Sequence, residues 1–281
     1  MRTNRILTAL AAASSIALAL SACGGGSSQS GDSASGSEAT GTLVVGASPS
    51  PHAKILKFVQ DNLAEKAGLK LDIKEYTDYI QPNVALNDGS LDANYFQTVP
   101  YLENQEKESG YDFTAGEGIH LEPLGIFSEK IKDLKDFPDG GTIGIISDVT
   151  NQSRALALLA KEGFVELPAG DADANVNTVK KLKNFEFKEV EGAQLVRSLA
   201  DVDIAAINGN FAQEGGLSLA NDAIATESPE NNPAVNVLVW KSDASGAKLE
   251  EIKKLDELLH STEVKDYIEK TWSDGSVIPA F

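Results

Sequence analysis

Between Thr42 and Phe281, short apolar runs typical of strands alternate with segments whose apolar residues recur at helical spacing. The strand-like TLVVGAS leads into HAKILKFVQDNLAEKAG, where Gly68 is a stop signal, and the strand-like LKLDIKEY follows. Regular alternation of this kind predicts an α/β fold with mainly parallel sheets. Ligands of open α/β sheets bind beyond the carboxyl ends of the strands, against helix starts, so a site is expected there.

The alternation restarts after FPDGG. Before it stand the predicted helices IQPNVALNDGS and PYLENQEKES, the strand LDANYFQ and the extended HLEPLGIFS. After it come a strand at TIGIIS, a helix from Asn151, a strand at NFEFKEV, a helix at AQLVRSLA and a strand at DIAAING. A strand at NVLVW and two helices around Leu255 and Tyr267 complete the chain. This length suffices for two lobes or one large domain.

The amino terminus predicts export and a lipid anchor. Residues 1–22 contain two arginines, no acidic residue and an apolar run, which is typical of a signal peptide and too short to span a bilayer. The segment ends in LSAC, which matches the lipobox of bacterial lipoproteins, so Cys23 is the expected lipidation site. The alternative is an ordinary signal peptide that leaves Cys23, the single cysteine, as a free thiol. Residues 23–41 are polar and rich in glycine and serine, and are expected to be a flexible tether.

The charge of the chain excludes one class of partner. The formal net charge is −18 at pH 7, whereas a nucleic-acid binder needs a basic surface. The same charge disfavours adsorption to an anionic membrane. We therefore expect contact with the membrane through the lipid alone.

Motifs for catalysis are missing from the sequence. The three histidines, His52, His120 and His260, have no glutamate or cysteine at a spacing typical of a metal site or a nucleophile, and HLE at His120 is too short to count as a metal motif. No G-x-S-x-G, phosphate-binding loop or dinucleotide fingerprint occurs. We expect no catalytic residue, metal or cofactor, and structural roles for His52 and His120.

Polar and aromatic residues lie where the predicted strands end. They are Tyr79, Phe96, Asn151, Arg154, Asn208 and Asn236. Each alone is common as a turn or core residue, but together they suit an amino-acid ligand. Arg154 stands near the predicted start of the helix in SDVTNQSRALALLA, where a cation is unfavourable, so an anion is expected beside it. Asparagine carbonyls could accept from an ammonium group, and the two aromatic rings could enclose a side chain.

Several motifs stand in the order of a known family. They are SPHAKIL, YTDYIQPNVAL, DANYFQTVPYL, HLEPLGIFS, DVTNQSRAL, INGNFA and VIPAF. The chain resembles the NlpA/MetQ group, the methionine-binding lipoproteins of bacterial ABC importers. The resemblance implies a two-lobed periplasmic-binding-protein fold with a ligand cleft between the lobes, formed by residues 42–127 with 237–281 and by residues 128–236. It also implies that the six strand-end residues contact the ligand, and that Arg154 with Asn151 binds its carboxylate.

Two departures from the family concern the side-chain end of the pocket. Thr98 stands where the family commonly has His, and Ala234 where it commonly has Tyr; Ser147 and Val149 also differ. Smaller residues at the first two positions suggest a bulkier or differently polar ligand, and Thr98 joins the six predicted contact residues.

The sequence thus predicts a lipid-anchored, monomeric solute-binding protein on the extracytoplasmic face of the cell membrane, which passes an amino acid to ABC permease subunits. Methionine is the favoured ligand. The alternatives are another amino acid or a short methionine-containing peptide, a surface interaction lipoprotein without a transport role, and a metal-binding importer.

Overall fold

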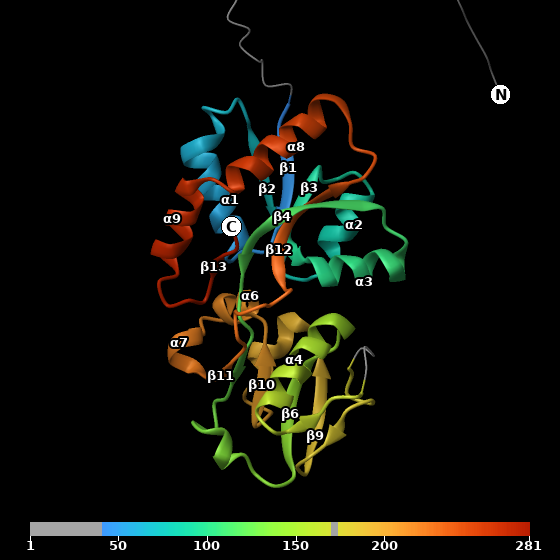
Figure 1. Cartoon of the computed structure of the whole chain (residues 1–281), viewed down its shortest axis with the longest axis vertical. Helices are drawn as coiled ribbons and strands as arrows, with labels where there is room; N and C mark the ends of the chain where they lie inside the picture. Colours follow the sequence, from blue (N-terminus) through green and yellow to red (C-terminus); the bar gives the residue numbers. More distant parts are fainter. Residues whose placement is uncertain (1–40, 170–173) are drawn as a thin grey trace, which may run out of the picture. The chain divides into compact units, whose positions relative to one another are not determined.

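The computed structural model describes residues 41–169 and 174–281. The predicted signal peptide, Cys23 and nearly all of the tether lie outside the described residues. Two β-sheets, each covered by helices, build this part of the chain (Figure 1). No helix within the described ranges is long and apolar enough to cross a bilayer.

The first sheet has six strands in the order β13-β4-β12-β3-β1-β2. Its strands are β1 (Leu43–Ala47), β2 (Leu71–Glu75), β3 (Ala93–Thr98), β4 (Phe113–Leu121), β12 (Val235–Lys241) and β13 (Ile278–Pro279). The helices around it are α1 (His52–Val59), which continues as a π-helical turn (Gln60–Ala64), α2 (Gln81–Asn87), α3 (Val99–Ser109), α8 (Gly246–Leu259) and α9 (Thr262–Thr271).

The second sheet has five strands in the order β11-β5-β10-β6-β9. Its strands are β5 (Gly125–Phe127), β6 (Gly141–Ile146), β9 (Phe185–Val190), β10 (Ile204–Ile207) and β11 (Ala223–Thr226). A two-stranded ribbon accompanies it, formed by β7 (Val165–Glu166) and β8 (Lys180–Lys181). Its helices are α4 (Val149–Lys161), α5 (Leu195–Ser198), α6 (Gly209–Glu214), α7 (Leu219–Asp222) and the 3-10 turns Leu134–Asp136 and Gly192–Gln194.

Both sheets are mixed, so the prediction of mainly parallel sheets was wrong. Strand β1 is parallel to β2 and β3, and β6 is parallel to β9 and β10. However, β12 runs antiparallel to β3 and β4, and β5 runs antiparallel to β10 and β11. The chain crosses from the first sheet to the second after β4 and returns after β11, and the strands at these crossings enter against the direction of their neighbours.

The crossings lie slightly earlier than the sequence suggested. Strand β5 belongs to the second sheet, although residues 125–127 were assigned to the first lobe, and β12 joins the first sheet from Val235 rather than from residue 237. The lobes are therefore joined at residues 122–124 and 227–234. A run such as HLEPLGIFS contains no local signal that tells which sheet each half will join.

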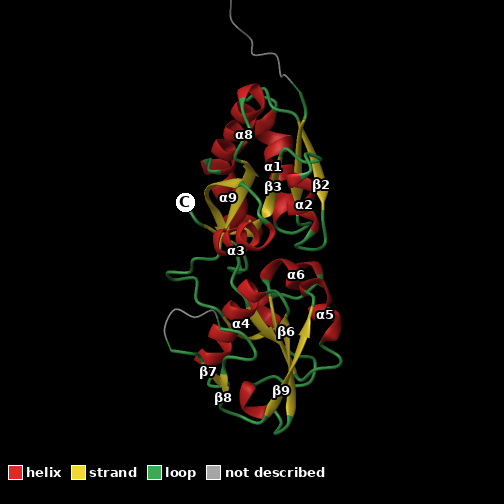
Figure 2. Cartoon of the chain, turned by 90° about the vertical axis from the view of Figure 1, so that its right-hand side faces the viewer, coloured by secondary structure: helices red, strands yellow, loops and turns green. Residues whose placement is uncertain are grey.

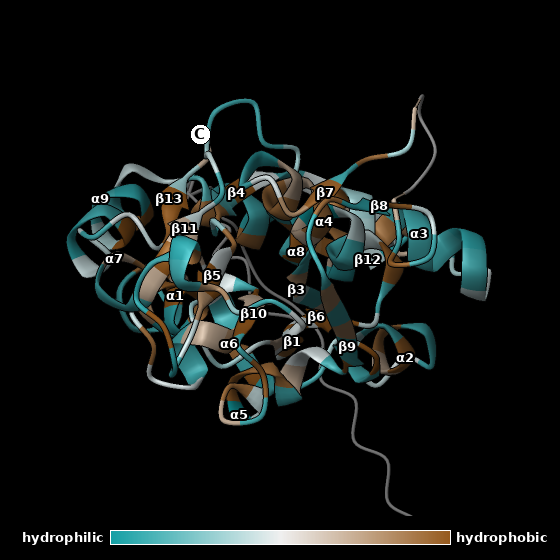
Figure 3. Cartoon of the chain, turned by 90° about the horizontal axis from the view of Figure 1, so that it is seen from below, coloured by the Kyte–Doolittle hydropathy of each residue, from teal (hydrophilic) through white to brown (hydrophobic). Residues whose placement is uncertain are grey.

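Apolar side chains fill both faces of each sheet. In the first sheet, Val45 and Ile55 belong to the cluster that β1 and α1 share with α8 and α9, and Leu86 and Val237 belong to the cluster on the opposite face. The second sheet is likewise covered on both faces by separate clusters. Figure 2 shows the helices flanking both sheets, and Figure 3 shows hydrophobic residues along the inner strands and hydrophilic residues over outer helices such as α3 and α9.

Helix α4 begins two residues before the predicted Asn151. Asp148 caps it, because its carboxylate accepts a hydrogen bond from the backbone N–H of Asn151 at 2.9 Å. Since the helix starts at Val149, Arg154 lies just beyond the first turn rather than within it. The helix start alone therefore gives a weaker reason for an anion beside Arg154 than the sequence suggested.

Candidate ligand-binding cavity

The residues predicted to contact a ligand line one cavity, to which both sheets contribute. These are Tyr79, Phe96, Thr98, Asn151, Arg154, Asn208 and Asn236. Further lining residues were not among the predicted contacts: His52, Gln97, Tyr101, Glu122, Gly209 and Asn210. The cavity lies beyond the carboxyl ends of several strands and against helix starts, and contact of these residues with a ligand stays a prediction.

Each sheet contributes its residues through strand ends. Phe96 and Thr98 end β3, and Asn236 lies near the start of the antiparallel β12, where it is paired with Thr98. From the second sheet, α4 follows β6 and carries Arg154, while Asn208 follows β10 and is the first flanking residue of α6. The alternation of strand and helix thus brings residues more than a hundred positions apart into one site.

Arg154 has an anionic partner within the chain. Its Nε donates to the two carboxylate oxygens of Glu227 at 2.8 and 2.9 Å, and its Nη2 also donates to Glu227 and, at 2.6 Å, to the backbone carbonyl of Glu122. Both side chains are mostly buried, with exposed fractions of 14% and 16%. Among the described residues, Nη1 of Arg154 has no hydrogen-bond partner. Glu227 therefore holds the edge of the guanidinium formed by Nε and Nη2, and Nη1 remains available.

The asparagine side chains bond mainly to one another and to residues behind them. Asn208 Nδ2 donates to Asn151 Oδ1 at 2.7 Å, while Asp148 holds the amide nitrogen of Asn151 at 3.0 Å. The Oδ1 atom of Asn236 lies 2.9 Å from Nε2 of His52. The carbonyls of Asn151 and Asn236 are therefore already engaged, and of these three side chains only Asn208 has an unpartnered carbonyl oxygen.

Aromatic rings form one wall of the cavity. The ring of Tyr79 lies 6.0 Å from that of Phe96, 5.7 Å from that of Tyr101 and 4.6 Å from that of Phe211, measured between centroids. Tyr79 also donates from its hydroxyl to Asn210 on α6, so the wall reaches from the first sheet to the second. Such a surface suits an apolar or thioether side chain.

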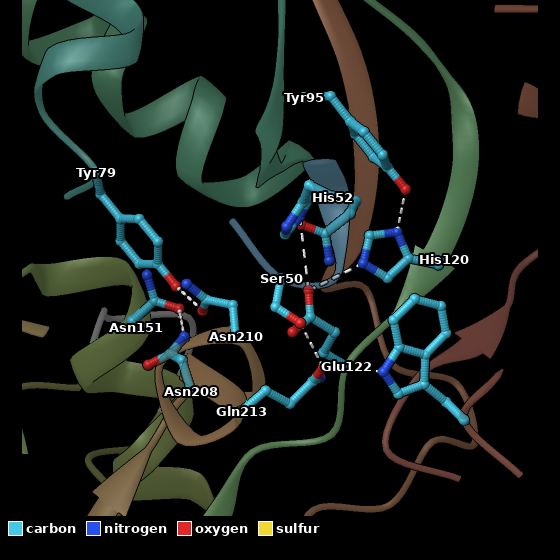
Figure 4. A network of polar contacts seen from close by, with 12 residues as sticks. Ser50, His52, Tyr79, Tyr95, His120, Glu122, Asn151, Asn208, Asn210 and Gln213 are labelled. Carbon is cyan, nitrogen blue, oxygen red and sulfur yellow. Dashed lines mark hydrogen bonds and ion pairs between the residues drawn. The ribbon is translucent and has the colours of Figure 1, made fainter. Parts of the chain in front are cut away.

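Behind the cavity lies a buried network of two histidines and a glutamate (Figure 4). His120 Nε2 lies 2.9 Å from Oε1 of Glu122, His52 Nε2 lies 3.5 Å from the same oxygen, and the hydroxyl of Tyr95 contacts His120 Nδ1. Burial lowers the pKa of His52 to about 4 and that of His120 to about 3, and it raises the pKa of Glu122 to about 7. Both imidazoles are therefore neutral at physiological pH.

The donor atoms of His52, His120 and Glu122 are close enough together to surround a cation. Hydrogen bonding accounts for the same arrangement without one. If Tyr95 donates to Nδ1 of His120, then Nε2 of His120 carries the ring proton and donates to Oε1 of Glu122. Among the described residues, Oε2 of Glu122 and Nδ1 of His52 have no hydrogen-bond partner. Asn236 accepts from Nε2 of His52 in the same way.

The cavity is small, and a larger chamber adjoins it. Its free volume is about 20 Å³, room for roughly one water molecule. The chamber, of about 500 Å³, shares Thr98, Asn151 and Arg154 with the cavity and is also lined by Glu227 and Ala234. Thr98 thus stands between the two spaces, whereas Ala234 borders only the chamber. A ligand of amino-acid size requires the lining residues to move apart.

Local sequence signals do not mark the unpredicted lining residues. His52 was expected to have a structural role, and Glu122 was not singled out. Nothing in SPHAKIL or HLEPLGIFS shows that the two segments meet. Asn210 lies in the first turn of α6, a helix within INGNFA that the sequence pattern did not reveal. Only the position of each segment at a strand end could have suggested them.

Comparisons with known proteins agree with this architecture. The family described as NlpA lipoprotein matches residues 43–281. The methionine-binding lipoprotein MetQ of Bacillus subtilis is 42% identical over 244 residues, which cover 84% of this chain and 87% of that protein.

Two solved structures are also similar. A lipoprotein from Actinomyces odontolyticus is 70% identical with a TM-score of 0.83, covering 85% of this chain and 99% of that one. A nutrient-binding protein from Burkholderia cenocepacia, bound to methionine, is 37% identical with a TM-score of 0.80, covering 85% of this chain and 100% of that one.

Proposed function

The chain belongs to the NlpA lipoprotein family, and from this premise we propose that it is the solute-binding protein of an ABC importer and captures methionine. In this proposal Cys23 carries the lipid that anchors a monomer at the extracytoplasmic face of the membrane. The ligand binds between the lobes and passes to the permease subunits.

The observation that carries the proposal is the chemistry gathered in one cavity. The sequence predicted that Arg154 binds the ligand carboxylate together with Asn151. Because the side-chain nitrogen of Asn151 already donates to Asp148, we propose the side-chain nitrogen of Asn236 as the second donor in its place. The Tyr79 and Phe96 rings supply an apolar wall. Glu227 occupies the paired Nε and Nη2 donors of Arg154 and fixes the side chain, so the ligand carboxylate is expected at the remaining nitrogen, Nη1. The lobes would separate to admit the ligand and close around it.

Calorimetric titration with methionine tests the proposal, with Arg154→Ala as the decisive variant. Loss of a buried partner for the ligand carboxylate costs ~2–5 kcal/mol, a weakening of roughly 30-fold to several thousand-fold. Arg197→Ala is the matched control, because Arg197 is exposed on α5 and does not line the cavity. Unchanged affinity in Arg154→Ala would remove Arg154 from the site, and absence of methionine binding by the wild type would refute the proposed ligand.

The adjoining chamber favours a second candidate, a short methionine-containing peptide or a larger amino acid. Its volume of about 500 Å³ opens beside Thr98 and Ala234, the two positions that depart from the family. Titrations with glycyl-methionine, leucine and glutamine distinguish the candidates. Tighter binding of glycyl-methionine than of methionine would assign the chamber to the ligand.

The lipid anchor has its own test. Cys23→Ala removes the thiol that the proposed modification requires. The variant is expected to leave the membrane fraction or to retain its signal peptide, and to lose incorporation of labelled fatty acid. Continued incorporation of fatty acid would refute Cys23 as the modified residue.

A further inference from the structure

Three buried amide side chains, which we call the amide triad, stand next to the aromatic wall of the cavity. They are Asn83 on α2 and Asn94 and Gln97 on β3, with exposed fractions of 0%, 0% and 2%. Gln97 also lines the cavity, whereas Asn83 and Asn94 do not. Burying an amide costs free energy unless its polar atoms find partners, so a cluster of three in a hydrophobic layer calls for a physical reason.

The amide triad is closed by its own hydrogen bonds. Asn83 Nδ2 donates to Gln97 Oε1 at 3.0 Å, and Gln97 Nε2 donates back to Asn83 Oδ1 at 2.8 Å and to Asn94 Oδ1 at 3.0 Å. Asn94 Nδ2 donates to Asn83 Oδ1 at 2.9 Å and to the backbone carbonyl of Pro82 at 3.3 Å. Every side-chain nitrogen and oxygen of the triad therefore has a partner, and the amide of Gln97 is engaged behind the cavity rather than inside it.

Strand β3 contains a β-bulge at Phe96. Two consecutive residues of β12, Val237 and Leu238, lie opposite Gln97 and Tyr95, which leaves Phe96 between them without a partner in the register. A bulge turns side chains out of the regular alternation of a strand. The direction of the Phe96 ring therefore depends on whatever holds this bulge in place.

The amide triad spans the bulge. Asn94 and Gln97 are three positions apart, so on a regular strand their side chains would point to opposite faces of the sheet. Here both side chains bond to Asn83. The bulge makes this shared contact possible, and the contact in turn holds the bulge.

The triad also joins the two halves of the aromatic wall. Asn83 lies in the first turn of α2, just after the segment that carries Tyr79. Asn94 and Gln97 belong to the strand that carries Phe96, and the two rings are 6.0 Å apart between centroids. The hydrogen bonds from Asn83 to β3 therefore tie the segment of one ring to the strand of the other.

We propose that Asn83, Asn94 and Gln97 are positioning residues that set the side-chain specificity of the cavity, by holding Phe96 at a fixed distance from Tyr79. This rests on the proposed function and deepens it. Hydrogen bonds are directional, so a satisfied amide network keeps one geometry where apolar packing would tolerate several. The triad acts through the shape of the wall and supplies no polar group to the ligand.

The experiment measures selectivity in a variant that does not touch the cavity. Affinities of the wild type and Asn83→Ala are measured for methionine by calorimetry and for alanine by displacement of methionine. The two ligands share the carboxylate and the amino group and differ only in the side chain that the wall would enclose. We expect Asn83→Ala to lower the ratio of methionine affinity to alanine affinity by about threefold to tenfold.

Two control variants separate positioning from stability. Asn87→Ala changes an exposed asparagine of the same helix and should leave the affinity ratio unchanged. Ile268→Ala opens a cavity in the cluster on the opposite face of the sheet, so it should lower the melting temperature without changing the ratio. Equal weakening of both ligands in Asn83→Ala would mean a purely structural role and would overturn the inference.

A second variant guards against misfolding of Asn83→Ala. Asn94→Ala keeps the two hydrogen bonds between Asn83 and Gln97, and it is expected to shift the ratio in the same direction by about twofold to fourfold. A crystal structure of either ligand-free variant should show Phe96 displaced from Tyr79. An unmoved ring, or an unchanged affinity ratio in both variants, would overturn the inference. Because the ring is observed without ligand, failure of the wild type to bind methionine would count against the proposed function alone.

Discussion

The two sides of the cavity are built differently. On the side of the six-stranded sheet, a buried network links Tyr95, His120, Glu122, His52 and Asn236, and Glu122 lies where the chain crosses to the second sheet. On the side of the five-stranded sheet, the polar groups stand at helix starts and bond to one another at the cavity itself, as Asn208 does with Asn151.

This difference separates a preformed side from an adaptable one. A buried network whose members hold each other keeps its geometry whether or not a ligand is present, but any broken link leaves polar atoms without partners. Helix-start groups that bond across the cavity can exchange those bonds for bonds to a ligand. Substitutions on the first side are therefore expected to lower stability, and those on the second chiefly to lower affinity.

The largest expected effect comes from His120→Ala. The change opens a cavity beneath the site and removes the partner of the Tyr95 hydroxyl and the nearer partner of Oε1 of Glu122, so the free energy of unfolding should fall by roughly 3–5 kcal/mol. Asn208→Ala on the other side breaks a single bond and should cost about 0.5–1.5 kcal/mol. Denaturant unfolding measures both, and equal losses would erase the distinction between the sides.

A smaller effect is expected where the cavity meets the chamber. Thr98→His should narrow the passage, and Ala234→Tyr should fill part of the chamber. Together they are expected to shift the preference toward methionine over glycyl-methionine by ~1–3 kcal/mol, because filling an apolar space discriminates by about that much. Because Ala234 does not line the small cavity, Ala234→Tyr alone should leave methionine affinity nearly unchanged. Weaker methionine binding in that single variant would mean that the chamber is part of the methionine site.

Acidification should weaken binding by about tenfold between pH 8 and pH 6. Burial raises the pKa of Glu122, which lines the cavity, to about 7. A ligand with a positive ammonium group favours the ionised carboxylate, so binding below that pH is expected to release a proton. The titratable and charged groups that face Glu122 are His52, His120, Arg154, Glu214, Tyr79 and Tyr95. Calorimetry in buffers of different ionisation enthalpy detects the proton.

Glu214 is the confounding group, because burial also raises its pKa to about 7. The pH dependence should survive in Glu214→Gln and disappear in Glu122→Gln. The opposite pattern would mean that Glu214 on α6, and not Glu122, is the group whose protonation controls binding.

The smallest expected effect concerns contacts that join the lobes. Gln213 on α6 accepts hydrogen bonds at 3.0 Å from Ser50 and from Trp272 of the other lobe. Gln213→Ala should favour separated lobes and weaken methionine about twofold to tenfold, since each such bond contributes ~0.5–1.5 kcal/mol. Small-angle scattering should show a larger radius of gyration for the ligand-free variant than for the wild type. Identical scattering would mean that Gln213 does not hold the lobes together.

The fold could be predicted from the sequence wherever the local pattern was strong. Strands β1, β2, β3, β6, β9, β10 and β12 and the long helices lie where apolar periodicity placed them. The short helix α6 and the strands β11 and β13 were not predicted, because segments of two to six residues carry too little periodicity. The direction of several strands was also predicted wrongly, because it depends on where the chain crosses between the two sheets.

The sequence by itself determined the set of polar and aromatic residues at the strand ends, since each stands beside a strong strand or helix signal. Only the tertiary structure decided how they are used. Glu227, 73 residues along the chain, pairs with Arg154, and Nε2 of His52 is hydrogen-bonded to the side-chain carbonyl of Asn236. Glu122 lies beside His52 and lines the cavity because the segments SPHAKIL and HLEPLGIFS, which are distant in the sequence, are buried together. Hydrogen-bond partners and buried charge depend on distances between remote segments, and those distances exist only in the folded chain.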